Sequence, residues 1–260
     1  ILRLRRLLGL FAFFYAMLVM VAMPKSLLTG TITAVFFPTL AEEYNAGRPG
    51  AMQSTLFAGL RAAWLLVIPA AVGLLALGRP AVAFLFQRGA FNERSTGLVF
   101  GLMAIFAVRL VMDSTQDVLS MGFYARHNTR IVMWANLGGA GLNVALSFLL
   151  VKPFGIAGLA WATTLASAGL ALALYWLNRQ MDSSPGEERG LALALLRTGL
   201  ACGGMAALIA GVGRLGLGII PYLIVSIGGG CLVYAGLHTL LGGREIHAVW
   251  KNLVGSGDKK

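Results

Sequence analysis

The residues from Ser95 to Phe123 form an apolar stretch that is long enough to cross a membrane and carries charged side chains at its middle. Arg109 and Asp113 stand four residues apart, so a helix places them one turn apart on one face, with Asp117 a further turn along. A charge at that depth costs several kcal/mol unless it is paired or faces protein or water. The stretch therefore predicts a membrane helix whose polar face lies against a cavity or another protein.

The whole chain shares this apolar character. Of its 260 residues 58% are hydrophobic and only 12% are charged, and its mean hydropathy is +0.78. A soluble domain of this length needs far more polar surface, so we expect an all-α membrane protein with several spans. The net charge is +11, but the basic residues stand singly between apolar runs, which argues against a nucleic-acid partner.

No pattern in the sequence indicates catalysis. It has no nucleophile and base at suitable spacing, no metal-ligand spacing and no phosphate-binding loop. Cys202 and Cys231 both lie in apolar runs and are expected to be packing residues. We therefore expect no enzyme activity, no cofactor and no metal.

The apolar runs predict seven membrane helices, at about residues 7–40, 56–77, 95–123, 131–151, 156–177, 193–213 and 218–241. The first is expected to be one helix bent at Pro24, because a hairpin of two crossings needs about 40 residues or more. Residues 78–94 are predicted to form an irregular connection, in which Asn92 or Ser95 caps the next helix. Short turns at Lys152-Pro153 and Gly213-Arg214 are expected to join antiparallel neighbours.

This organisation divides the chain into four parts. Residues 1–177 hold five helices, 178–192 a polar loop, 193–241 a terminal helix pair and 242–260 a basic tail. Seven crossings put the chain ends on opposite sides, and Lys and Arg are more numerous on the C-terminal side, so we expect the C-terminus to be cytoplasmic. The chain opens without a methionine, which suggests that it begins inside a longer protein.

Several motifs are similar to those of a known family. The segments are LFQRGAF (residues 85–91), FFPTLAEEYNAG (36–47), GFYARHNTR (122–130) and GIAGLAWAT (155–163). Together they resemble the MurJ/MviN family of lipid II flippases, which belongs with the multidrug and polysaccharide exporters, and the resemblance covers nearly the whole chain. LFQRGAF is the most specific of the four.

The resemblance is to the second half of that family, from the eighth of fourteen helices to the end. It implies a bacterial inner-membrane protein that exposes a lipid-linked peptidoglycan precursor alternately to each side of the membrane, together with a missing N-terminal half. The motif residues, for which it implies structural roles, are Pro24, Pro38, Arg88, Gly89, Phe91, Phe123 and Tyr124. For Arg88, shaping the loop is the favoured role over substrate contact.

The chain also departs from the family pattern. The family's eighth helix usually carries an Asp-Arg pair just before the conserved proline, and that arginine is thought to meet the substrate pyrophosphate. The matching positions here hold Leu18 and Val19, and an apolar side chain cannot pair with a diphosphate. Lys25 stands nearby, either as a snorkelling side chain or as a cation facing a polar cavity.

The candidate substrate or cavity residues are Lys25, Arg109, Asp113, Gln116 and Asp117. For the charged residues of the central stretch, one interpretation is a ladder of ion pairs within the helix that neutralises itself. The other is a polar face that lines a cavity or receives a partner subunit, with Asp117 as a possible proton-coupling carboxylate. His238, near the end of the last helix, is expected to lie at the membrane interface rather than to bind a cofactor.

Three functional hypotheses follow. The first is the C-terminal half of a MurJ-like flippase that works with an N-terminal half. The second is a transport-inactive scaffold or accessory subunit that packs against other membrane proteins. The third is an exporter of another polyprenyl-linked or polyanionic lipid. The replaced Asp-Arg pair and the absent first half favour the second.

Overall fold

A computed structural model describes residues 30–87, 92–181 and 185–242 of the chain. Throughout these three ranges the regular structure is helical and there is no strand. The labelled helices are α2 (Pro49–Phe86), α3 (Glu93–Ala125), α4 (Thr129–Phe154), α5 (Ile156–Met181), α6 (Pro185–Gly213) and α7 (Ile219–Leu240). Within the described residues, six helices are long and apolar enough to cross a membrane. The predicted all-α membrane fold is confirmed.

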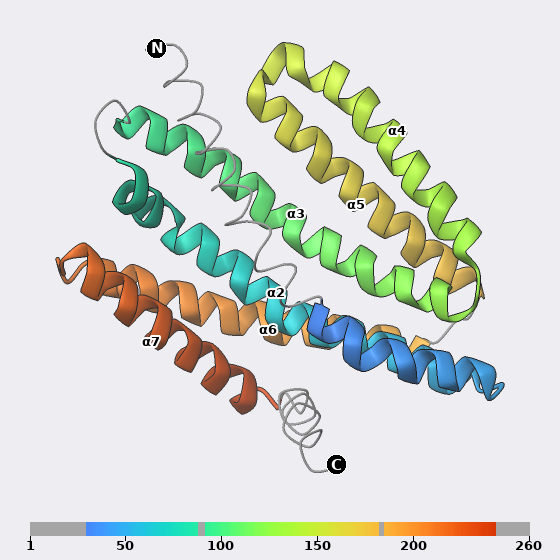
Figure 1. The fold of residues 1–260 in the computed structure, drawn as a ribbon. Helices are drawn as coiled ribbons and strands as arrows, with labels where there is room; N and C mark the ends of the chain where they lie inside the picture. The colour runs from blue at the N-terminus through green and yellow to red at the C-terminus, as the bar shows by residue number, and fades with distance from the viewer. Residues whose placement is uncertain (1–29, 88–91, 182–184, 243–260) are drawn as a thin grey trace.

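The central elements are α2 and α3, which run side by side (Figure 1). Helix α5 packs on α3 and carries α4 on its outer side, while α6 packs on α2 and pairs with α7. The molecule is thus a row of helix pairs, and its buried side chains lie in several separate clusters at the interfaces between helices. The helices are consequently exposed on their outer faces, as lipid permits.

Polar contacts join these helices where the side chains are buried. Trp64 Nε1 on α2 donates to Thr115 Oγ1 on α3 at 2.8 Å. On the other side of α2, the Tyr234 hydroxyl of α7 donates to the Leu65 carbonyl oxygen at 2.6 Å. Such hydrogen bonds add about 1 kcal/mol each to helix association in a membrane.

The first predicted helix, residues 7–40, lies mostly outside the described residues, and so does its expected bend at Pro24. Residues 30–45 are helical, so this helix continues beyond the predicted end. Ile32 and Leu40 are buried in a cluster with Leu56 of α2 and Val118 of α3.

The irregular connection predicted for residues 78–94 is wrong in its first part, because α2 continues to Phe86 through Pro80. Val82 is buried against Val99 and Met103 of α3. This apolar contact stabilises the last turns of α2 despite the proline, whose freed backbone groups are tolerated in membrane helices.

The start of α3 is capped as predicted by Asn92. Its Oδ1 atom accepts a hydrogen bond from the backbone N–H of Ser95 at 3.1 Å. This contact satisfies one of the backbone donors that a helix N-terminus leaves unpaired.

The polar loop predicted for residues 178–192 is also wrong over most of its length, since α5 reaches Met181 and α6 begins at Pro185. Two ion pairs hold the ends of these helices, Arg61 Nη1 to Glu187 Oε2 at 2.9 Å and Arg179 Nε to Glu188 Oε1 at 3.0 Å. Acidic residues in the first turn of α6 also suit the positive end of the helix dipole. The polar residues of this segment therefore indicate helix ends at the membrane surface and not a loop.

The turn predicted at Lys152-Pro153 is wrong in position, because the chain turns at Gly155 instead. Lys152 and Pro153 fall within the last turn of α4, and Gly155 takes a left-handed conformation with φ of +57°. Gly158 then lies so close to α4 that a Cβ atom there would collide with the Leu150 carbonyl oxygen. The motif GIAGLAWAT thus combines a turn glycine with a close-packing glycine.

Candidate functional site

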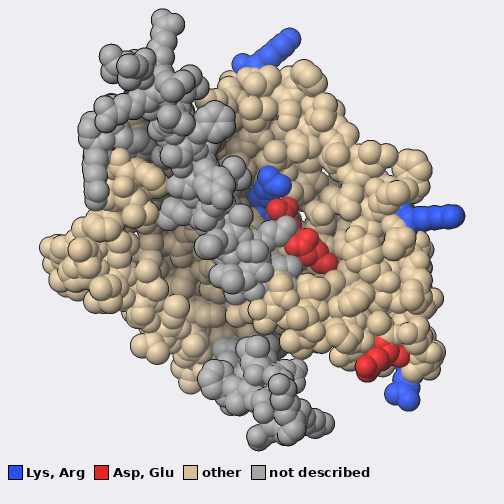
Figure 2. Space-filling model, in the orientation of Figure 1, with Lys and Arg blue, Asp and Glu red and all other residues tan. Residues whose placement is uncertain are grey.

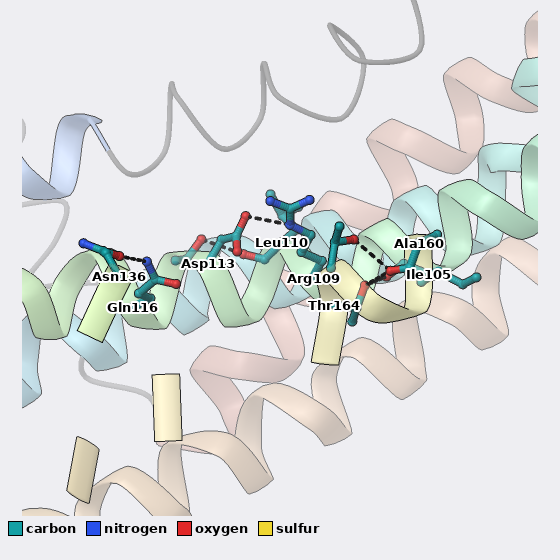
Figure 3. Close-up of polar contacts among 10 residues, drawn as sticks. Ile105, Arg109, Leu110, Asp113, Gln116, Asn136, Ala160 and Thr164 are labelled. Atoms are coloured by element: carbon teal, nitrogen blue, oxygen red, sulfur yellow. Dashed lines mark hydrogen bonds and ion pairs between the residues drawn. The ribbon is translucent and has the colours of Figure 1, made fainter. Parts of the chain in front are cut away.

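Arg109 and Asp113 lie near the middle of α3 and form an ion pair along the helix. The distance from Arg109 Nε to Asp113 Oδ2 is 3.3 Å, without the alignment of a hydrogen bond (Figure 3). The side chains are 37% and 17% exposed. The pair therefore neutralises itself, as its helical spacing predicts, while part of it stays open to the surface.

A pocket of about 220 Å³ adjoins this pair between α3, α4 and α5. Its lining residues are Arg109, Asp113, Gln116, Gly139, Ala140, Asn143, Thr163, Ala166, Ser167 and Leu170. Basic and acidic side chains lie together in a hollow near the centre of the face drawn in Figure 2, away from the rim where other charged groups lie. One face of α3 thus carries both the Arg109–Asp113 ion pair and part of the pocket lining.

The local sequences explain why a pocket forms here. Helix α4 packs closely on α5 but contacts α3 only sparsely, which leaves a gap along α3. Gly139 on α4 lies against Leu170 of α5, so the two backbones approach closely. Thr163 and Ser167 stand four residues apart on α5, and both line the gap.

Polar side chains bridge the helices on either side of the ion pair (Figure 3). Gln116 Nε2 on α3 donates to Asn136 Oδ1 on α4 at 3.3 Å. Toward the start of α3, Thr164 of α5 donates to the carbonyl oxygens of Ile105 at 3.4 Å and Ala160 at 2.9 Å. These contacts fix α4 and α5 against the polar face of α3.

The structure brings three of the five candidate cavity residues together. Arg109, Asp113 and Gln116 line the pocket, whereas Asp117 is half-buried one turn along α3 and is not among the lining residues. Lys25 lies outside the described residues. Asn143, Thr163 and Ser167 were not identified from the sequence, because small polar residues are common in membrane helices and their spacing alone does not reveal a shared cavity.

Of the family-motif residues that the structure describes, one is buried and two are exposed. Phe123 is fully buried in a cluster with α4 and α5. Tyr124 is 42% exposed, and Pro38 is exposed on the helical segment 30–45. Four others, Pro24, Arg88, Gly89 and Phe91, lie outside the described residues.

A buried arginine forms a second polar cluster that the sequence did not reveal. Arg126, at the end of α3, is 9% exposed and lies over the ring of Phe123. Its Nη1 donates to Asn178 Oδ1 of α5 at 2.9 Å and its Nη2 to Gln53 Oε1 of α2 at 3.3 Å. This side chain therefore joins three helices. The sequence feature that could have indicated this cluster is Asn178, a polar residue at the end of an otherwise apolar run.

The described residues contain no group of three or more His, Cys, Asp or Glu side chains that could hold a metal ion. His238 is 1% exposed and lies in the last turn of α7, so its ring is buried against other parts of the protein. Its ring contacts Tyr234 one turn earlier on α7, with the ring centroids 5.9 Å apart. Packing of α7 against α6 and α2 buries this part of the helix.

Comparison with known proteins gives consistent matches. The family model described as "Lipid II flippase MurJ" matches residues 9–226. A "Probable lipid II flippase MurJ" of Bdellovibrio bacteriovorus is 30% identical over 235 residues, which cover 87% of this chain and 44% of that protein. A protein of the same name from Rhizobium tropici is 30% identical over 156 residues, which cover 60% of this chain and 28% of that protein.

The fold agrees with these matches. A solved structure of "Lipid II flippase MurJ, inward closed conformation" matches with a TM-score of 0.71 at 20% identity, over 86% of this chain and 46% of that one. The chain spans about half the length of the curated relatives it matches. Because the family model extends over most of the sequence, the chain belongs to the MurJ family.

Proposed function

We propose that this chain is the C-terminal half of a MurJ-type flippase, which moves lipid-linked peptidoglycan precursor across the bacterial inner membrane. The relatives are named as probable lipid II flippases, and the chain matches 44% of the length of the Bdellovibrio bacteriovorus protein and 28% of the Rhizobium tropici protein. The observation that carries the proposal is the polar pocket at the middle of membrane helix α3, because lipid alone would not accommodate its charges.

The proposed mechanism needs a second half. In transporters built from two repeats, substrate binds near the membrane midplane between the halves, and rocking of one half against the other exposes it to each side in turn. The polar face of α3, α4 and α5 would form this chain's wall of such a cavity. The Arg109–Asp113 pair supplies polarity at low net charge, so the face stays stable in the states without substrate.

A second candidate function is that of a transport-inactive subunit in a larger membrane complex. Leu18 and Val19 stand where the family resemblance implies an Asp-Arg pair for the pyrophosphate. Without that cation the chain would keep the fold but lose one substrate contact. The same polar face would then receive a side chain or helix of a partner protein.

Complementation of a flippase-depleted bacterial strain tests the two candidates. The chain is expressed alone and together with the N-terminal half of the Bdellovibrio bacteriovorus relative. The flippase proposal predicts rescue of growth in the paired strain, and loss of that rescue on Asn143→Leu. The matched control is Val144→Leu, which changes an exposed neighbour on α4.

The opposite result is equally informative. If no pairing restores growth, and the chain instead copurifies at fixed stoichiometry with other membrane proteins, the flippase proposal fails and the subunit function replaces it. Expression is checked in each strain by membrane fractionation.

A further inference from the structure

We propose that the pocket between α3, α4 and α5 binds an uncharged group rich in hydroxyl and amide functions, such as an N-acylated sugar of a lipid-linked headgroup, and does not bind the phosphate. This inference rests on the proposed transport function for the identity of the ligand. The chemical groups of the lining residues favour a sugar over a phosphate.

The charge of the lining argues against a phosphate site. Arg109 is the only basic side chain among the described lining residues, and Asp113 lies 3.3 Å from it. The described lining therefore has a formal net charge of zero. A diphosphate carries two or more negative charges, and burying it requires unpaired cations or several aligned donors. The described lining residues offer one guanidinium, and it is already paired.

The uncharged groups of the lining are placed for hydrogen bonding instead. Asn143 Oδ1 accepts from Ser147 Oγ at 3.2 Å, which leaves the Asn143 amide nitrogen as a donor. Thr163 Oγ1 donates to the Ala160 carbonyl oxygen, so its oxygen remains an acceptor. Ser167 makes no hydrogen bond within the described part of the chain.

Gln116 completes this set from the side of α3. Its Nε2 donates to Asn136, which leaves its own amide oxygen as an acceptor toward the pocket. The lining thus presents both donors and acceptors from amides and hydroxyls. A sugar hydroxyl both donates and accepts, and an acetamido group does so through separate atoms, which matches this mixture.

The size and shape of the pocket also favour one sugar ring. Its volume of about 220 Å³ is below the range of about 300–1,000 Å³ that is usual for drug-sized ligands. The walls of the pocket are shallow where small residues line it, at Gly139, Ala140 and Ala166. Leu170 supplies an apolar surface for the C–H face of a sugar ring. A complete lipid headgroup does not fit, so the pocket would bind only one part of it.

Protection of engineered cysteines from alkylation tests the assignment. The Ser167→Cys and Thr163→Cys variants are made in the full chain with Cys231→Ser, which removes the exposed native thiol. Membranes are treated with N-ethylmaleimide, an uncharged reagent, in the presence of N,N′-diacetylchitobiose or inorganic pyrophosphate. We expect the disaccharide to slow alkylation of either variant by about twofold when half of the pockets are occupied. Pyrophosphate is expected to leave the rate unchanged.

Two controls make the result specific. Leu215→Cys, in the exposed turn between α6 and α7, is expected to react at the same rate with and without sugar. Adding Asn143→Leu to the Ser167→Cys variant is expected to abolish protection. Protection by pyrophosphate, or none by the disaccharide at either cysteine, overturns the sugar assignment. Growth rescue is measured separately, so a failed sugar assignment leaves the flippase proposal standing when rescue is observed.

Discussion

Arg109 and Asp113 neutralise each other within one turn of α3, and they are the two charged side chains among the described residues that line the pocket. Removing one takes away a charge that compensates the other at the middle of a membrane helix. We expect Arg109→Met or Asp113→Leu alone to destabilise the protein by about 1–4 kcal/mol, and the double variant to be less damaged than either single variant. Reversible unfolding in detergent measures these free energies. Two single variants as stable as the parent would show that the pair does not hold this helix.

Arg126 has a different role, because its partners are amide oxygens on two other helices. Arg126→Met removes the donors to Gln53 and Asn178 and leaves buried acceptors without them. Each such loss costs about 1–3 kcal/mol, so the melting temperature in detergent is expected to fall clearly. Arg126→Lys is expected to recover part of this loss. Tyr124→Leu, at an exposed neighbour, is the control, and a Met variant as stable as that control would contradict the role.

These two arginines show what sequence reasoning can reach at the scale of a residue. The Arg109–Asp113 pair follows from helical spacing alone, since both residues lie on one helix. The cluster around Arg126 joins residues that are 52 and 73 positions apart. Its geometry depends on how three helices pack, and no local pattern in the sequence encodes that packing.

At the scale of elements, the close approach of α4 and α5 depends on Gly158. A methyl group there collides with the Leu150 carbonyl oxygen, so Gly158→Ala must push the two helices apart. We expect a loss of about 1–3 kcal/mol in unfolding free energy. Gly141→Ala, at a helix position with open space around it, is the matched control and is expected to be neutral or slightly stabilising. Equal effects of the two substitutions would mean that this close packing is unimportant.

The helix bounds were predicted well where apolar runs end in turn glycines or a capping residue, as at Gly213 and Asn92. They were predicted poorly where contacts between distant residues decide. Pro80 did not end α2, because Val82 packs against α3. The polar residues after α5 did not form a loop, because Glu187 pairs with Arg61 on α2. In both cases a contact made in the folded protein outweighs a local preference.

At the scale of the whole molecule, several basic side chains lie at one end of the bundle. Arg61 lies in the first half of α2, Arg126 directly follows α3, and Arg179 lies near the end of α5. If this end faces the cytoplasm, as the positive-inside rule predicts, the C-terminus does so too. We expect a C-terminal green fluorescent protein fusion to fluoresce in bacterial cells, and an alkaline phosphatase fusion to be inactive. The reverse pattern would invert the orientation.

The order of the helices has a consequence for how the pocket forms during synthesis. The lining residues that the structure describes all lie on α3, α4 and α5, which are consecutive in the chain, and α6 and α7 pack on the far side of α2. The polar wall is therefore complete once α5 has entered the membrane. The nascent chain can therefore shield Arg109 and Asp113 from lipid before α6 and α7 leave the ribosome. These charges do not have to stay exposed to lipid until synthesis of the protein is finished.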